Sequence, residues 1–183
     1  MPNVDVESIS RLHYASEKYP GYCIPMMGLH PTSVGEDWQM QLNTTKDQLT
    51  KHQYIAIGEI GIDLYWDKTF EKEQKYVFEE QLRWSIEYNL PVDIHSRDAI
   101  PECIECINNI GADKLKGVFH SICGTEEELK AILNLDNFLL GINGVVTFKN
   151  STLSTVLGLT DLSHIIIETD APYLAPVPYR GKR

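Results

Sequence analysis

Five apolar segments of the chain each end in a side chain that can bind a metal ion. These side chains are His30 after "IPMMGL", Glu59 after "YIAIG", His95 after "LPVDI", His120 after "LKGVF" and Asp170 after "IIIET". Imidazole and carboxylate groups bind zinc, manganese and magnesium in hydrolases, where the metal polarises a substrate oxygen and activates water. The recurrence of such endings predicts one divalent-metal site.

Each of these residues also has a purely structural interpretation. A lone histidine at a strand end is more often a loop or core residue than a ligand, and we interpret His13, His52 and His164 in that way. Glu59 could accept hydrogen bonds from amides of the glycine-rich turn around it, and Asp170 could be a turn residue before a proline. The recurrence at successive strand ends favours the metal site over these interpretations.

The carboxylates suggest separate roles. Glu59 could bridge two metals with its two oxygens, and Asp170 could hold a metal and also accept a proton from the attacking water. Asp63 could orient a ligand, contact substrate or belong to a turn. Glu168 is two residues before Asp170 and therefore points to the same side of the strand, where it could support that residue.

Two arginines are candidates for binding a phosphate. Arg97 follows His95 closely, and Arg180 follows a proline-rich run. The planar guanidinium group can donate two parallel hydrogen bonds to a phosphate, although an exposed surface position is the default for arginine.

The surrounding segments alternate between strand-like and helix-like patterns. Strands are predicted at 22–30, 54–61, 90–95, 115–120, 138–148 and 164–170, and helices at 36–53, 68–89, 97–111, after a Thr125–Glu128 capping box, and around Leu153. Such alternation predicts parallel strands with helical crossovers, in an open doubly wound sheet or a (β/α)8 barrel. No glycine-rich phosphate-binding motif follows any strand, which disfavours the nucleotide-binding open sheet. The carboxyl ends of parallel strands meet at one face, so the five side chains should converge.

Composition predicts one globular domain over residues 1–183, with 43% hydrophobic and 23% charged residues. No apolar run approaches the roughly 18 residues of a membrane span, and no signal peptide is recognised, so we expect a cytoplasmic protein. Cys103 lies on an apolar helical stripe, so we interpret its C-x-x-C pair with Cys106 as reduced core cysteines. The net charge of −10 implies that metal ions and a few arginines would supply most of the electrostatic attraction for any bound phosphate.

The segments "GLHPT", "AIGEIGIDLYWDKT", "LPVDIHSRDA", "GVFHSICGT" and "IIIETDAPYLAPVPYRGKR" together resemble the TatD family of metal-dependent deoxyribonucleases, within the amidohydrolase-like TIM barrels. The resemblance implies a divalent-metal site in which Glu59, His95, His120 and Asp170 match the family's ligands, with His30 nearby. It also implies 3′ to 5′ exonuclease or related hydrolytic activity on DNA ends or single strands, with one or two Mg, Zn or Mn ions. Thr32 stands where the family often has a second histidine.

The chain departs from the family at its start, because no His-x-His occurs in it. Its opening residues resemble the loop after the second barrel strand, which predicts an α/β (β/α)8 TIM barrel that is incomplete, with about strands 3 to 8 present. Six strands leave open edges, so the chain is either a fragment of a longer protein or a truncated form that self-associates. We favour the fragment.

Two other functions compete with the nuclease. The same metal site could hydrolyse esters or amides, such as an aminoacyl ester on tRNA, because selectivity lies in loop contacts. A truncated barrel could instead be a non-catalytic interaction module. No serine-nucleophile elbow and no Cys-His arrangement is present, which disfavours covalent hydrolysis.

Overall fold

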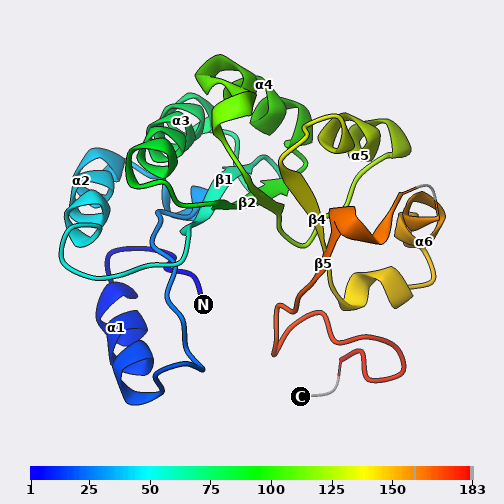
Figure 1. Ribbon diagram of the computed structural model, residues 1–183, viewed down its shortest axis with the longest axis horizontal. Helices are drawn as coiled ribbons and strands as arrows, with labels where there is room; N and C mark the ends of the chain where they lie inside the picture. Colours follow the sequence, from blue (N-terminus) through cyan, green and yellow to red (C-terminus); the bar gives the residue numbers. More distant parts are fainter. Residues whose placement is uncertain (159, 182–183) are drawn as a thin grey trace.

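The computed structural model describes residues 1–158 and 160–181, which form an open crescent with strands inside and helices outside (Figure 1). Within these residues, five parallel strands follow one another across a single sheet in chain order. They are β1 (Ile57–Asp63), β2 (Val92–Arg97), β3 (Gly117–Phe119), β4 (Phe138–Ile142) and β5 (Ile165–Ile167). Sequential order is typical of a (β/α)8 barrel wall, since doubly wound sheets reverse their order. The sheet is therefore a partial barrel, as the sequence predicts.

In the described part of the chain, six helices flank the strands, of which the third, fourth and fifth pack directly on the outer side of this wall. They are α1 (Ile9–Lys18), α2 (Trp38–Gln48), α3 (Glu71–Tyr88), α4 (Ile100–Ile110), α5 (Glu126–Leu133) and α6 (Leu153–Leu157), with short 3-10 turns η1 (Pro31–Ser33), η2 (Ala112–Lys114), η3 (Gly144–Thr147) and η4 (Leu162–His164). The capping box at the start of α5 is present as predicted. Sequence analysis missed α1, because only Ile9 and Leu12 of this polar helix are buried.

Four predicted strands are shorter than expected: those at 115–120 and 164–170 are reduced to β3 and β5, and those at 22–30 and 138–148 differ more. Residues 22–30 form only isolated bridges, Pro2 with Met26 and Met27 with Ile57, because the segment divides its hydrogen bonds between residues 1–4 on one side and β1 on the other. The strand predicted at 138–148 ends at Ile142, because the side-chain oxygen of Asn143 accepts a hydrogen bond from the Val145 N–H at 3.0 Å and starts a 3-10 turn.

β1 also differs from its predicted range of 54–61. It begins at Ile57, continues to Asp63, and its register against β2 shifts between Ile57 and Ile60 by one extra residue. A β-bulge of this kind re-aims a side chain. Glu59 therefore lies inside the strand, at the bulge, rather than at the end of the strand.

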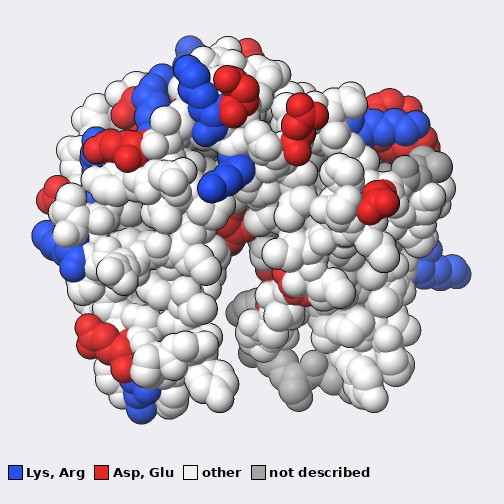
Figure 2. Space-filling view, viewed as in Figure 1, with Lys and Arg blue, Asp and Glu red and all other residues white. Residues whose placement is uncertain are grey.

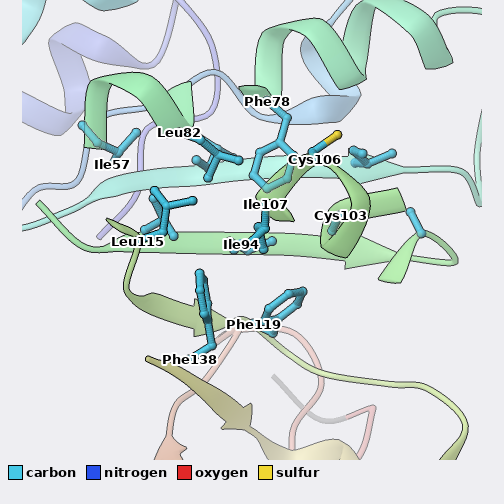
Figure 3. Packing of buried hydrophobic residues seen from close by; sticks show 14 of the residues in the cluster. Ile57, Phe78, Leu82, Ile94, Cys103, Cys106, Ile107, Leu115, Phe119 and Phe138 are labelled. Atoms are coloured by element: carbon cyan, nitrogen blue, oxygen red, sulfur yellow. The ribbon is translucent and has the colours of Figure 1, made fainter. Parts of the chain in front are cut away.

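Buried apolar side chains fill the layer between the helices and the sheet (Figure 3). Phe78 and Leu82 of α3 and Ile107 of α4 pack with Ile57 and Ile94 of the strands, and all five are essentially inaccessible to solvent. Alternation along β2 then turns Asp93 and His95 to the opposite, inner side of the wall. The core therefore fixes which side chains face the inside of the crescent.

The four cysteines are all free, and Cys103 and Cys106 are buried in α4 as predicted. No helix of the described residues is both long and apolar enough to cross a membrane.

The last strand is less buried than its sequence suggests. Ile166 and Ile167 are 44% and 88% exposed, although a run of isoleucines is typical of a strand covered on both faces. Within the described residues β5 pairs only with β4, so one edge of this strand is open. Figure 1 shows the first residues of the chain and the segment that follows β5 on opposite sides of the gap of the crescent.

Candidate metal centre

The first cluster of candidate ligands combines His30, Glu59 and His95. Glu59 Oε1 lies 3.0 Å from His95 Nδ1 and 3.6 Å from His30 Nε2, and the two imidazole rings meet edge-on with centroids 4.6 Å apart. One ligand atom from each residue lies within 4.8 Å of the others, which is close enough to share a metal ion. Thr32 Oγ1 lies 2.7 Å from His30 Nδ1, so the other ring nitrogen faces Glu59.

Close packing of β1 on β2 brings this cluster together. A Cβ on Gly58 would lie 2.6 Å from the Cβ of Asp93, and a Cβ on Gly61 would lie 2.0 Å from the His95 carbonyl oxygen. Gly61 also has a φ of +136°, which L side chains rarely adopt. Only glycine allows the bulged strand to approach β2 so closely, and this approach sets Glu59 beside His95.

Asp63 holds His95 from the other side. Its Oδ2 lies 2.8 Å from His95 Nε2, while its Oδ1 accepts hydrogen bonds from the backbone N–H groups of Tyr65 at 3.0 Å and Trp66 at 3.3 Å. Asp63 is 2% exposed. Asp63 therefore contacts His95 with one oxygen and closes a turn with the other, and its role toward a metal ligand or a substrate stays a prediction.

The second cluster gathers around His120, directly after β3. Its Nδ1 lies 2.7 Å from Glu168 Oε2 and its Nε2 lies 2.6 Å from Asp170 Oδ1. Asn143 donates a hydrogen bond to Asp170 Oδ2 at 2.8 Å, and the Ser121 N–H donates to Glu168. Glu168 and Asp170 thus both contact His120, in keeping with their spacing of two residues.

Charge and burial together set the protonation of both clusters. Burial opposes ionisation of Glu59, but hydrogen bonds with His30 and His95 outweigh it and hold the pKa of Glu59 well below its usual range. Burial also opposes the charged form of the His95 and His120 imidazoles. Hydrogen bonds with Asp63 and Glu59 nevertheless raise the pKa of His95 to about 9. Hydrogen bonds with Asp170 and Glu168 likewise raise the pKa of His120 to about 11. A metal ion must therefore displace protons to bind.

Asp93 is a further acid on the inner side, which sequence analysis missed. It is 7% exposed and precedes His95 by two residues, so its side chain shares the inner face. Burial, with the nearby charges of Glu59 and Glu168, raises the pKa of Asp93 to about 7. A carboxylate between apolar strand residues was the signal that could have identified it. Asn143 was missed as well, because its role depends on where β4 ends.

The two arginines that the sequence predicts to bind phosphate, Arg97 and Arg180, lie outside these clusters. The guanidinium carbon of Arg97 is 3.6 Å from the centroid of the Tyr65 ring, and that of Arg180 is 4.2 Å from the Phe148 ring. Arg180 lines a pocket of about 500 Å³ together with Lys149 and Cys123. Figure 2 shows acidic side chains inside the central recess of the crescent.

This donor set suits a divalent cation. Histidine nitrogens and carboxylate oxygens from β1, from β2 and from the residues that follow β3 and β5 lie on the inner side, and His95 and His120 each contact a carboxylate at both ring nitrogens. That arrangement fixes the ring and raises the basicity of the ligand in metal sites. The chemistry that it supports is the polarisation of a substrate oxygen and the activation of water.

Comparison with known proteins shows the family to which the chain is similar. The family model for TatD related DNase matches residues 1–183. An uncharacterized metal-dependent hydrolase, YabD of Bacillus subtilis, is 34% identical over 180 residues, which cover 98% of this chain and 70% of the relative. The 3′-5′ ssDNA/RNA exonuclease TatD of Pantoea vagans is 34% identical over 91% of this chain and 65% of its own length.

A solved structure shows the same fold. The crystal structure of YjjV, a TatD homologue from Escherichia coli, superposes with a TM-score of 0.89 at 26% identity, over 99% of this chain and 70% of that one. The chain spans 58% to 70% of the length of the first curated relatives that it matches.

Proposed function

Because the chain belongs to the TatD family of metal-dependent hydrolases, we propose that it hydrolyses phosphodiester bonds at the ends of single-stranded nucleic acid. The observation that carries this proposal is the pair of histidine–carboxylate clusters on one side of the barrel wall, with Glu59 3.0 Å from His95 and Asp170 2.6 Å from His120. The relative from Pantoea vagans, named as an exonuclease on single-stranded DNA and RNA, supports this choice of substrate.

We assign the metal ligands to Glu59, His95, His120 and Asp170, with His30 as a further candidate. One or two Mg, Mn or Zn ions held by them would polarise the phosphate and lower the pKa of the attacking water. Glu59 forms a hydrogen bond with His95 and interacts electrostatically with His120. A carboxylate shared between the two clusters would have both interactions.

The residues of the chain would divide the remaining work. Asp170 accepts the proton of the attacking water, since the hydrogen bond with His120 lowers its pKa and keeps it ionised. Asn143 and Glu168 hold the Asp170–His120 pair in place. Arg97 and Arg180 bind phosphate oxygens at the mouth, where Lys149 adds a positive charge beside Arg180.

The proposal is tested by turnover of a 3′-labelled single-stranded oligonucleotide with added Mg²⁺, Mn²⁺ or Zn²⁺. We expect shortening from the 3′ end that EDTA stops and that Glu59→Gln reduces by at least about 100-fold, since loss of a residue of this kind removes transition-state stabilisation. Glu87→Gln, which changes an exposed carboxylate on α3, is the matched control.

An aminoacyl ester substrate should be assayed in parallel. Turnover of the ester without turnover of the oligonucleotide would replace the nuclease with the ester hydrolase. Equal activity of the Glu59→Gln variant and the native chain would contradict both, and would favour a non-catalytic interaction module.

A further inference from the structure

The loop between β1 and α3 presents two aromatic side chains to solvent beside the metal centre. Tyr65 is 52% exposed and Trp66 is 71% exposed, and their rings meet edge-on with centroids 4.8 Å apart. Neighbouring exposed rings of this size leave apolar faces in water. Such faces are typical of binding sites, because aromatic rings bury a large area on contact with a ligand.

Arg97 lies over the same two rings and forms an aromatic cluster with them. Its guanidinium carbon lies 3.6 Å from the Tyr65 centroid and 5.2 Å from the Trp66 centroid. Within residues 1–158 and 160–181, the Arg97 side chain forms no ion pair, so its donors remain available to an anion. Arginine that stacks on a ring keeps its hydrogen-bonding edge free for a phosphate.

A single carboxylate ties this cluster to the metal centre. Asp63 accepts hydrogen bonds from the N–H groups of Tyr65 and Trp66 with one oxygen, and its other oxygen lies 2.8 Å from His95 Nε2. Asp63 and Arg97 are also register partners across β1 and β2. The aromatic loop is therefore anchored directly beside a candidate metal ligand.

We propose that Tyr65, Trp66 and Arg97 form a stacking platform for the nucleobase next to the cleaved phosphate, with Arg97 contacting that nucleotide's phosphate. The inference rests on the proposed nuclease function and narrows its substrate. A base inside a duplex is already stacked and paired, so only an unpaired end offers a free face to these rings. The platform thus selects single strands by shape and largely independently of sequence.

The test compares two single-stranded oligonucleotides that differ only at the 3′ end, one with a normal nucleotide and one with a tetrahydrofuran abasic unit. The ratio of their kcat/KM values should favour the base by roughly 5- to 150-fold, the range that base–aromatic stacking supplies. This ratio should fall towards one in Trp66→Ala and in Tyr65→Ala. Tyr22→Ala, which removes an aromatic ring that is 92% exposed in the loop after α1, should leave the ratio unchanged.

Binding without turnover separates this inference from the proposed function. Of the three tryptophans, Trp66 is 71% exposed, Trp84 is 2% exposed and Trp38 is partly buried against the core. The part of the tryptophan-fluorescence quenching by an oligonucleotide in EDTA that a Trp66→Phe variant loses therefore reports on Trp66. Quenching by a thymidine oligonucleotide but not by its fully abasic counterpart supports the platform even if no phosphodiester bond is cleaved. Hydrolysis with equal kcat/KM for both 3′ ends, and no quenching, would overturn the platform and leave the nuclease standing.

Discussion

Two histidines of the site, His95 and His120, are each held between two carboxylates. His95 lies between Glu59 and Asp63, and His120 lies between Glu168 and Asp170. Glu59, His95, His120 and Asp170 could be nominated from the sequence because each follows an apolar run, and Asp63 and Glu168 because of their spacing from Glu59 and Asp170. The sequence could not assign the pairs, since pairing depends on strand register and on where each strand stops.

Burial of Asp93 in this site opposes its ionisation, which predicts that the stability of the protein depends on pH. The pKa of Asp93 is about 7 in the folded protein and about 3.9 in an unfolded chain, so the folded state binds its proton more tightly. The stability that this proton supplies is complete below about pH 4 and is lost as the pH rises through 7.

Asp93→Asn should therefore stabilise the metal-free protein at high pH, because asparagine never ionises. We expect a gain in the free energy of unfolding of up to about 4 kcal/mol at pH 8 and little change at pH 4.5. Urea denaturation in EDTA at both pH values measures it. An equal effect at the two pH values would show that ionisation of Asp93 is not the cause.

At the scale of elements, the site depends on the bulge in β1. The sequence "YIAIGEIG" predicts a strand, but a continuous apolar run does not mark where a bulge falls or where the strand begins. Glu59 is therefore recognisable from the sequence as a candidate, whereas its place inside the strand is not. The close contact between Gly61 and the His95 carbonyl oxygen sets the position of Glu59 within the strand.

Gly61→Ala should disrupt both the strand pair and the metal centre. The added Cβ would meet backbone rather than a movable side chain, at a φ of +136°, so we expect a loss of at least about 2 kcal/mol in the free energy of unfolding together with weaker metal binding. Gly35→Ala is the matched control, because the nearest atom would be 3.9 Å away. Chemical denaturation and a metal titration of both variants measure the difference, and native behaviour of Gly61→Ala would refute the bulge as the organising feature.

For the whole molecule, the alternation of strands and helices was enough to predict parallel strands with helical crossovers, whereas the choice of a barrel wall rested on the resemblance to the TatD family. Helix α1 escaped prediction because its buried face is narrow, and the exposure of β5 escaped because a sequence pattern does not tell what covers a strand. Self-association through the open edges and a cytoplasmic location both stay predictions. The activity of a full-length barrel is likewise a proposal, since the chain spans 58% to 70% of its first curated relatives.

The proposed function requires that this chain holds divalent metal through Glu59, His95, His120 and Asp170. The most direct measurement is elemental analysis of the purified protein, loaded with Mn²⁺ or Zn²⁺ and desalted, beside the Glu59→Gln, Asp170→Asn double variant. The variant Glu127→Gln, Asp136→Asn makes the same charge change at two exposed acids and is the control. We expect about one or more equivalents of metal in the native chain and in the control, and little in the double variant. Equal metal in all three proteins, or none in the native chain, would contradict this requirement.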